Sequence, residues 1–109
     1  MNSFQPKTSY LRVATATPVV HIANVEKNLS EILKLYNAAS QKDVSLVVFP
    51  ELSLTGYSIG DLVQSPTLLQ SAKDALLTLA KSTKNTNAAM IVGLPLTIGN
   101  GLFNCAAFI

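Results

Sequence analysis

The feature of this sequence that most limits its fold is an apolar run, Leu46 to Phe49, that is followed directly by a proline and an acid. The run is apolar without alternation, which is typical of a strand in a sheet covered by helices on both faces. Pro50 cannot donate a hydrogen bond to a sheet, and it favours extended geometry at Phe49. The sequence therefore predicts a buried strand that ends at Glu51 or just before it.

Helical periodicity appears on both sides of this strand. From Asn24 to about Gln41, apolar residues recur at three- and four-residue spacing, with charges on the other face, as in an amphipathic helix. A second apolar stripe follows Ser65-Pro66, which supplies a capping serine and a proline at the first helical position. We expect both helices to cover the same sheet, with further strands at residues 10–16 and 89–94.

A hairpin is expected to complete the chain. Pro95 should end the third strand, because proline cannot join a sheet ladder. Gly99-Asn100-Gly101 is a turn signal, since glycine and asparagine tolerate positive φ, so residues 96–98 and 102–109 should pair antiparallel. The predicted fold class is α/β, with the order β-α-β-α-β-β.

Composition excludes several classes of partner. The 109 residues are 49% hydrophobic and 13% charged with a net charge of +2, which suits a packed core but offers nucleic acid no basic patch. No apolar run reaches the length of a membrane span, and the N-terminus lacks the apolar core of a signal peptide, so we expect a cytoplasmic protein. One cysteine and one histidine exclude an internal disulfide and predict no structural metal.

The last residues bear on the domain organisation. Ala106 to Ile109 is apolar and has neither turn residues nor a polar cap, whereas domains commonly end in a solvated tail. We expect residues 1–109 to be the incomplete N-terminal portion of a longer domain.

Glu51 is the leading candidate for a functional residue. Ligands of open α/β sheets bind just beyond the carboxyl ends of parallel strands, and a carboxylate there, in partly desolvated surroundings, suits a general base. The alternative, that Glu51 caps a loop or pairs with a lysine, remains open at this point.

The segment VVFPELSLTGY resembles the glutamate motif of the carbon-nitrogen hydrolase, or nitrilase, superfamily, with matches at Phe49, Pro50, Glu51 and Gly56-Tyr57. The further segments TGYSIGDLV, IVGLPL and LFNCAAFI resemble the N-terminal glutaminase domain found in the family of glutamine-dependent NAD synthetases. The resemblance runs from about Tyr10 to the last residue.

This resemblance implies an α-β-β-α sandwich, of which the chain would supply one helical layer and part of the sheets. It also implies hydrolysis of the glutamine amide by a glutamate, lysine and cysteine triad, with Glu51 as the base. The lysine and the nucleophilic cysteine would lie beyond residue 109, so the chain alone should be inactive and hold no cofactor. Ammonia would pass to a synthetase domain, not present here, that uses ATP and Mg²⁺ to convert nicotinate adenine dinucleotide to NAD, in a homo-oligomer.

Three other residues have side chains that could take part in chemistry. Tyr57 is a candidate for lining the glutamine pocket, with a packing role as the open alternative. Cys105 shares one strand face with Phe103, Ala107 and Ile109, which predicts a buried packing thiol and no nucleophile. His21 is assigned no role, because no partner for it is visible in the sequence.

Two alternative functions remain. The FPE motif is shared across the superfamily, so another carbon-nitrogen hydrolase, such as an amidase or carbamoylase, would fit. A non-catalytic binding or assembly module that recruits a partner through an open sheet edge would also fit a chain lacking part of the triad.

Overall fold

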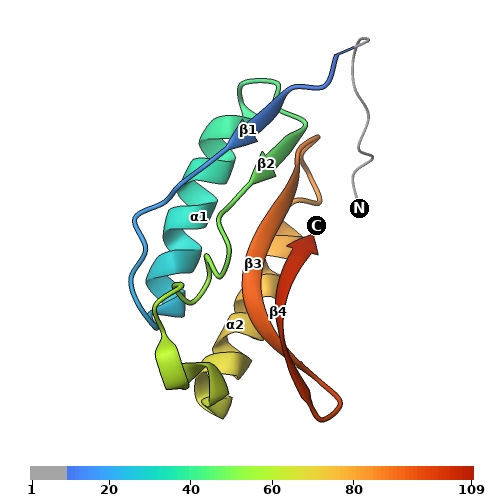
Figure 1. The fold of residues 1–109 in the computed structure, drawn as a ribbon. Coiled ribbons are helices and arrows are strands. Elements are labelled where there is room, and N and C mark those ends of the chain that lie inside the picture. Colours follow the sequence, from blue (N-terminus) through green and yellow to red (C-terminus); the bar gives the residue numbers. More distant parts are fainter. Residues whose placement is uncertain (1–9) are drawn as a thin grey trace.

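The chain forms a four-stranded sheet with one layer of helices against it, as seen in a computed structural model that describes residues 10–109 (Figure 1). The leader segment, residues 1–9, lies outside the described residues. The strands are β1 (Val13–Thr15), β2 (Leu46–Val48), β3 (Ala89–Ile98) and β4 (Gly101–Phe108), in the spatial order β1-β2-β3-β4. The helices are α1 (Val25–Ser40), α2 (Pro66–Ser82) and a short 3-10 helix, η1 (Gly60–Gln64).

The predicted order β-α-β-α-β-β is confirmed, with the short helix η1 added between β2 and α2. The starts of both long helices also match the prediction. The Asn24 side chain accepts a hydrogen bond from the Lys27 nitrogen at 3.1 Å, and the Ser65 hydroxyl accepts one from the Leu68 nitrogen at 3.3 Å. These caps satisfy amide groups that have no partner inside the helix.

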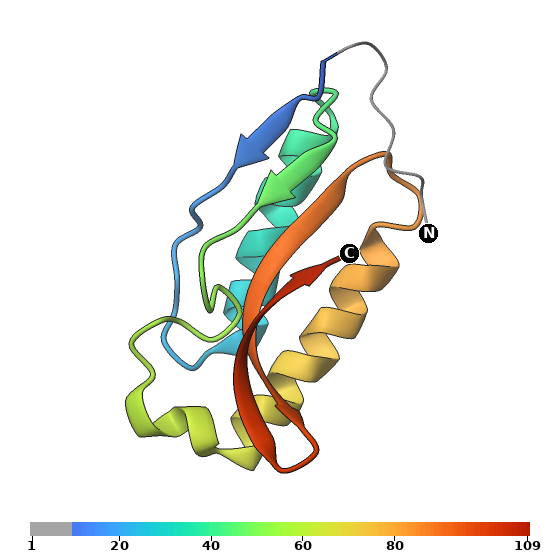
Figure 2. The same cartoon turned by 45° about the vertical axis from the view of Figure 1, so that its right-hand side comes forward.

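Both long helices lie on the same face of the sheet (Figures 1 and 2). Strands β1, β2 and β3 are parallel neighbours, and right-handed crossovers that move in one direction across a sheet place their helices on one side. The expectation that β2 is covered on both faces is therefore wrong for residues 10–109. Val47 is fully buried toward the helices, whereas Leu46 and Val48 point to the other face and are only half-buried.

Strand β3 continues through Pro95, which corrects the prediction that this proline ends it. Met90 exchanges backbone hydrogen bonds with Ile109, so every second residue from Met90 directs its amide toward β4. Pro95 has the opposite parity and directs its nitrogen toward the side where β2 has already ended. The missing N–H thus removes no bond from the ladder.

The turn between β3 and β4 falls within the expected turn signal, Gly99-Asn100-Gly101. Ile98 pairs with Gly101, so Gly99 and Asn100 are the central residues, and only Gly99 has a positive φ, of 61°. A positive φ at the first central residue is what a type II′ hairpin turn requires. The expected antiparallel pairing is confirmed.

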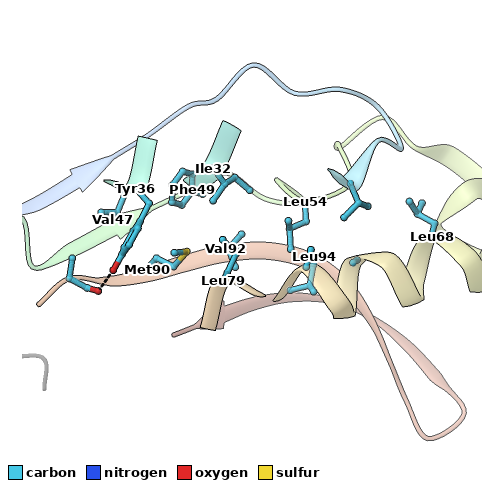
Figure 3. Close-up of a cluster of buried hydrophobic side chains, with 14 of the residues drawn as sticks. Ile32, Tyr36, Val47, Phe49, Leu54, Leu68, Leu79, Met90, Val92 and Leu94 are labelled. Carbon is cyan, nitrogen blue, oxygen red and sulfur yellow. Dashed lines mark hydrogen bonds between the residues drawn. The ribbon is translucent and has the colours of Figure 1, made fainter. Parts of the chain in front are cut away.

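The core lies between the sheet and the two helices (Figure 3). Its fully buried members are Ile32, Tyr36, Val47, Leu54, Ala72, Leu79, Met90, Val92 and Leu94. The Tyr36 hydroxyl donates to the Ala88 carbonyl oxygen at 2.6 Å and is hydrogen-bonded to the Thr86 hydroxyl. Within residues 10–109, no helix combines the length and apolar character needed to cross a bilayer.

Replacement of Tyr36 with phenylalanine is expected to lower the free energy of unfolding by about 1–2 kcal/mol, because the Ala88 oxygen loses its shorter hydrogen bond. Burial raises the pKa of the Tyr36 phenol, and the bond from Thr86 offsets this only in part. The folded state therefore resists ionisation, and its stability falls as pH rises past the ordinary tyrosine pKa of 10.0.

Urea unfolding at neutral pH and at about pH 11 measures both effects. Tyr36→Phe should lose less stability than the wild type on going to alkaline pH. The control is Tyr57→Phe, since Tyr57 is 72% exposed, and it should behave as the wild type does. Equal alkaline losses in all three proteins would contradict the assignment.

Candidate functional site

The segment that carries Glu51 leaves the sheet after β2 and crosses over the neighbouring strand. The Phe49 nitrogen still bonds the Ile91 oxygen at 2.9 Å, and the Leu54 nitrogen bonds the Gly93 oxygen at 3.1 Å. Between these two ties the chain bulges out, and Leu52 adopts a positive φ of 52°. Glu51 lies on this bulge, so it follows the end of the strand as the sequence predicts.

Gly93 makes room for the bulge. A Cβ atom at this position would lie 2.3 Å from the Leu52 nitrogen and 2.8 Å from the Pro50 carbonyl oxygen, closer than nonbonded atoms can approach. Val92 and Leu94 on either side are fully buried toward the helices, so Gly93 faces the opposite side of β3. Glu51 therefore lies over the helix-free face of the sheet.

One side chain contacts the Glu51 carboxylate through a hydrogen bond. The Asn104 Nδ2 donates to Glu51 Oε2 at 2.5 Å, and Asn104 lies on β4 opposite Pro95. Glu51 is exposed, so the expected partial desolvation is absent among residues 10–109. Within the same range no lysine forms an ion pair with Glu51. The alternative of a lysine partner is therefore wrong for residues 10–109.

A buried asparagine anchors the other end of the bulge. Asn28 of α1 is 1% exposed and donates from Nδ2 to the carbonyl oxygens of His21, at 2.8 Å, and Leu54, at 3.0 Å. Its Oδ1 accepts from the His21 nitrogen at 2.7 Å. The Asn28 side chain thus joins the loop after β1, the first helix and the Glu51 segment. In these bonds His21 contributes its backbone nitrogen and oxygen and not its ring.

Tyr57 and Cys105 take no part in these hydrogen bonds. Tyr57 is 72% exposed, so the packing alternative for its ring is wrong within the described residues. Cys105 pairs in register with Leu94 and shares its helix-facing side, on the opposite face of the sheet from Asn104 and Glu51. It is half-buried, so the prediction of a buried packing thiol is only partly met.

Three cavities formed by described residues lie elsewhere. A groove of about 770 Å³ runs between the N-terminal parts of α1 and α2, and two others have volumes of about 650 and 260 Å³. None of these three is lined by Glu51 or Tyr57. The part of the chain that the structure describes also has no group of three histidine, cysteine, aspartate or glutamate side chains placed to hold a metal ion.

Sequence reasoning named Glu51 but missed Gly93, Asn104 and Asn28 as parts of its setting. A glycine inside a strand pattern is a known sign of close backbone approach, so Gly93 could have been found. Asn104 and Asn28 carry no such sign, because their contacts depend on strand register and on the packing of a helix against a loop.

Comparison with known proteins gives consistent results. The sequence model of the family described as carbon-nitrogen hydrolase matches residues 11–109. A protein from Mycobacterium tuberculosis named glutamine-dependent NAD(+) synthetase is 34% identical over 100 residues, covering 92% of this chain. The chain spans only about 15% of the length of that relative.

Solved structures agree on the fold. The crystal structure of a glutamine-dependent NAD(+) synthetase from Cytophaga hutchinsonii superposes with a TM-score of 0.85 at 26% identity, over 93% of this chain and 17% of that one. An amidase from Nesterenkonia sp. superposes with a TM-score of 0.73 at 21% identity, over 92% and 38% of the two chains. The latter likeness concerns the fold alone.

Gly93→Ala is expected to destabilise the fold by about 3 kcal/mol, because the new methyl group meets backbone that cannot move aside as a side chain could. Chemical denaturation measures the loss. The matched control is Gly60→Ala, where nothing lies within 4 Å of the new Cβ and only the positive φ of 57° is strained. That strain should cost about 1 kcal/mol, and equal losses at the two glycines would rule out the steric argument.

Asn28→Ala is expected to lower the free energy of unfolding by about 2–3 kcal/mol, since it leaves buried backbone groups of His21 and Leu54 without their partner. Amide hydrogen exchange should also become faster in residues 52–56. Asn37→Ala is the control, because Asn37 lies on the same helix and is exposed. Unchanged exchange in that segment would show that Asn28 does not anchor it.

Proposed function

This chain belongs to the carbon-nitrogen hydrolase family, and from that membership we propose that it forms part of a domain that hydrolyses the side-chain amide of glutamine. The ammonia would serve an ATP-dependent conversion of nicotinate adenine dinucleotide to NAD. The observation that carries the proposal is the position of Glu51 on the bulge that follows β2, within a chain 34% identical to a glutamine-dependent NAD(+) synthetase.

Glu51 acts in this proposal as the general base. A thiol near its ordinary pKa of about 8.5 is mostly protonated at neutral pH and needs a base to take its proton as it attacks the amide carbon. The same carboxyl group can return that proton to the departing ammonia before water hydrolyses the thioester. The exposed face over which Glu51 lies leaves it accessible to such a partner.

The thiol and the oxyanion-stabilising lysine are not among the described residues in this proposal. Cys105 is unsuitable as the nucleophile because the sheet separates its side from that of Glu51. The resemblance instead assigns both groups to later parts of a longer protein, so residues 1–109 are proposed to be inactive alone. Closing the site against water would then strengthen each electrostatic interaction in it.

Tyr57 is proposed to contact the glutamine substrate. Its ring is exposed and lies one residue after Gly56, at the end of the segment that carries Glu51. An exposed phenol offers both apolar surface and a hydrogen-bonding hydroxyl to a ligand.

ATP and Mg²⁺ are proposed to bind in a separate synthetase domain. A cytoplasmic, homo-oligomeric protein is proposed on the resemblance alone.

Two other functions are alternatives to this proposal. Another carbon-nitrogen hydrolase would release ammonia from a different amide, and membership of the family is compatible with this alternative. A non-catalytic module would release none. Assaying the full-length protein with glutamine and with simple aliphatic amides separates the three.

Glu51→Gln in the full-length protein is expected to lower glutamine-dependent ammonia release by about 10²- to 10⁴-fold, the usual contribution of a positioned base. An ammonia assay coupled to glutamate dehydrogenase measures the rate. Glu26→Gln is the matched control, because Glu26 is an exposed carboxylate on α1, in the helical layer on the other side of the sheet. Undiminished release by Glu51→Gln would remove the assignment of the base.

A further inference from the structure

We propose that Asn104 is a positioning residue for the Glu51 carboxylate: its side-chain amide holds one carboxylate oxygen and leaves the other free to take the substrate-side proton. This inference rests on the proposed function and assigns a role to a residue outside the FPE motif. Asn104 does not itself contact the reacting atoms in this scheme.

The sheet brings the two residues together from distant parts of the chain. Asn104 is paired with Pro95, one step along the same face from the pair of Gly93 and Ala106. Gly93 is the residue over which the Glu51 bulge crosses. The side chain of Asn104 therefore points to the face on which Glu51 lies, and its Nδ2 donates to Oε2.

The hydrogen bond divides the carboxylate into two functionally different oxygens. Oε2 is held by Asn104, whereas Oε1 has no hydrogen-bond partner among residues 10–109. An exposed glutamate would otherwise sample many rotamers, and each immobilised side chain of this kind costs about 1–2 kcal/mol of entropy. A bond formed before the substrate arrives removes that cost from the reaction step.

A neutral amide is well suited to this task. It donates a hydrogen bond to the carboxylate without adding a full positive charge, which would oppose the uptake of a proton. Asparagine also has only two side-chain torsions, and it stands on a hairpin paired continuously from Ile91–Phe108 to Ile98–Gly101. Sites supported by paired strands hold their geometry better than sites on loops.

The test compares Asn104→Ala, Asn104→Asp and the control Asn100→Ala in the full-length protein, with ammonia release from glutamine as the readout. Asn104→Ala should lower kcat about tenfold or more, as expected for the loss of a hydrogen bond to a charged group, and leave KM almost unchanged. Asn104→Asp keeps the shape but replaces the donor with a second carboxylate, so its loss of kcat should be larger. Asn100→Ala removes an exposed amide from the same hairpin and should keep the wild-type kcat.

Thermal unfolding and crystal structures of the same variants separate positioning from folding. All three variants should unfold within a few degrees of the wild type, because both asparagines are exposed. The Glu51 side chain should leave its place in the Asn104→Asp structure. Wild-type kcat in Asn104→Asp, or an unmoved Glu51 there, would overturn the inference while leaving the proposed function standing. Absence of ammonia release from the wild-type protein would instead overturn the proposed function, and the role of Asn104 with it.

Discussion

The close approach of the Pro50–Leu52 backbone to Gly93 is the contact on which the rest of the candidate site depends. Because Gly93 has no side chain, the segment after β2 can cross β3 at a distance that a Cβ atom would forbid. Leu54 can then return to bond Gly93 and enter the core, while Glu51 stays on the outside of the bulge. The missing side chain at Gly93 of β3 thus allows the loop after β2 to have one exposed part, at Glu51, and one buried part, at Leu54.

The two faces of the sheet carry different kinds of side chain. The face toward α1 and α2 holds the apolar core, including the buried ring of Tyr36. The other face carries Glu51 and Asn104, together with exposed apolar side chains such as Val13 and Phe108. Strand alternation enforces this division, since a shift of one residue would exchange the faces. It also explains why Cys105, next to Asn104 in sequence, cannot meet Glu51.

Much of the fold could be predicted because its signals are local. Periodicity located both long helices, Asn24 and Ser65-Pro66 marked their starts, and the glycines near Asn100 marked the hairpin. The errors arose where neighbours in space decide the outcome. Among residues 10–109, the nitrogen of Pro95 points to a side with no strand beside it, so the proline stays within β3. In the same range β2 has helices on only one face, because both crossovers run in the same direction.

The sequence by itself determined the order of the elements and the position of Glu51 after a strand that Pro50 must end, because these follow from the geometry of single residues and their spacing. Only the tertiary structure decided what surrounds that carboxylate. Asn104 reaches Glu51 through the register of β3 with β4, and Asn28 reaches Leu54 through the packing of α1. Contacts between residues so far apart in the chain depend on how strands pair and layers stack, which no local pattern specifies.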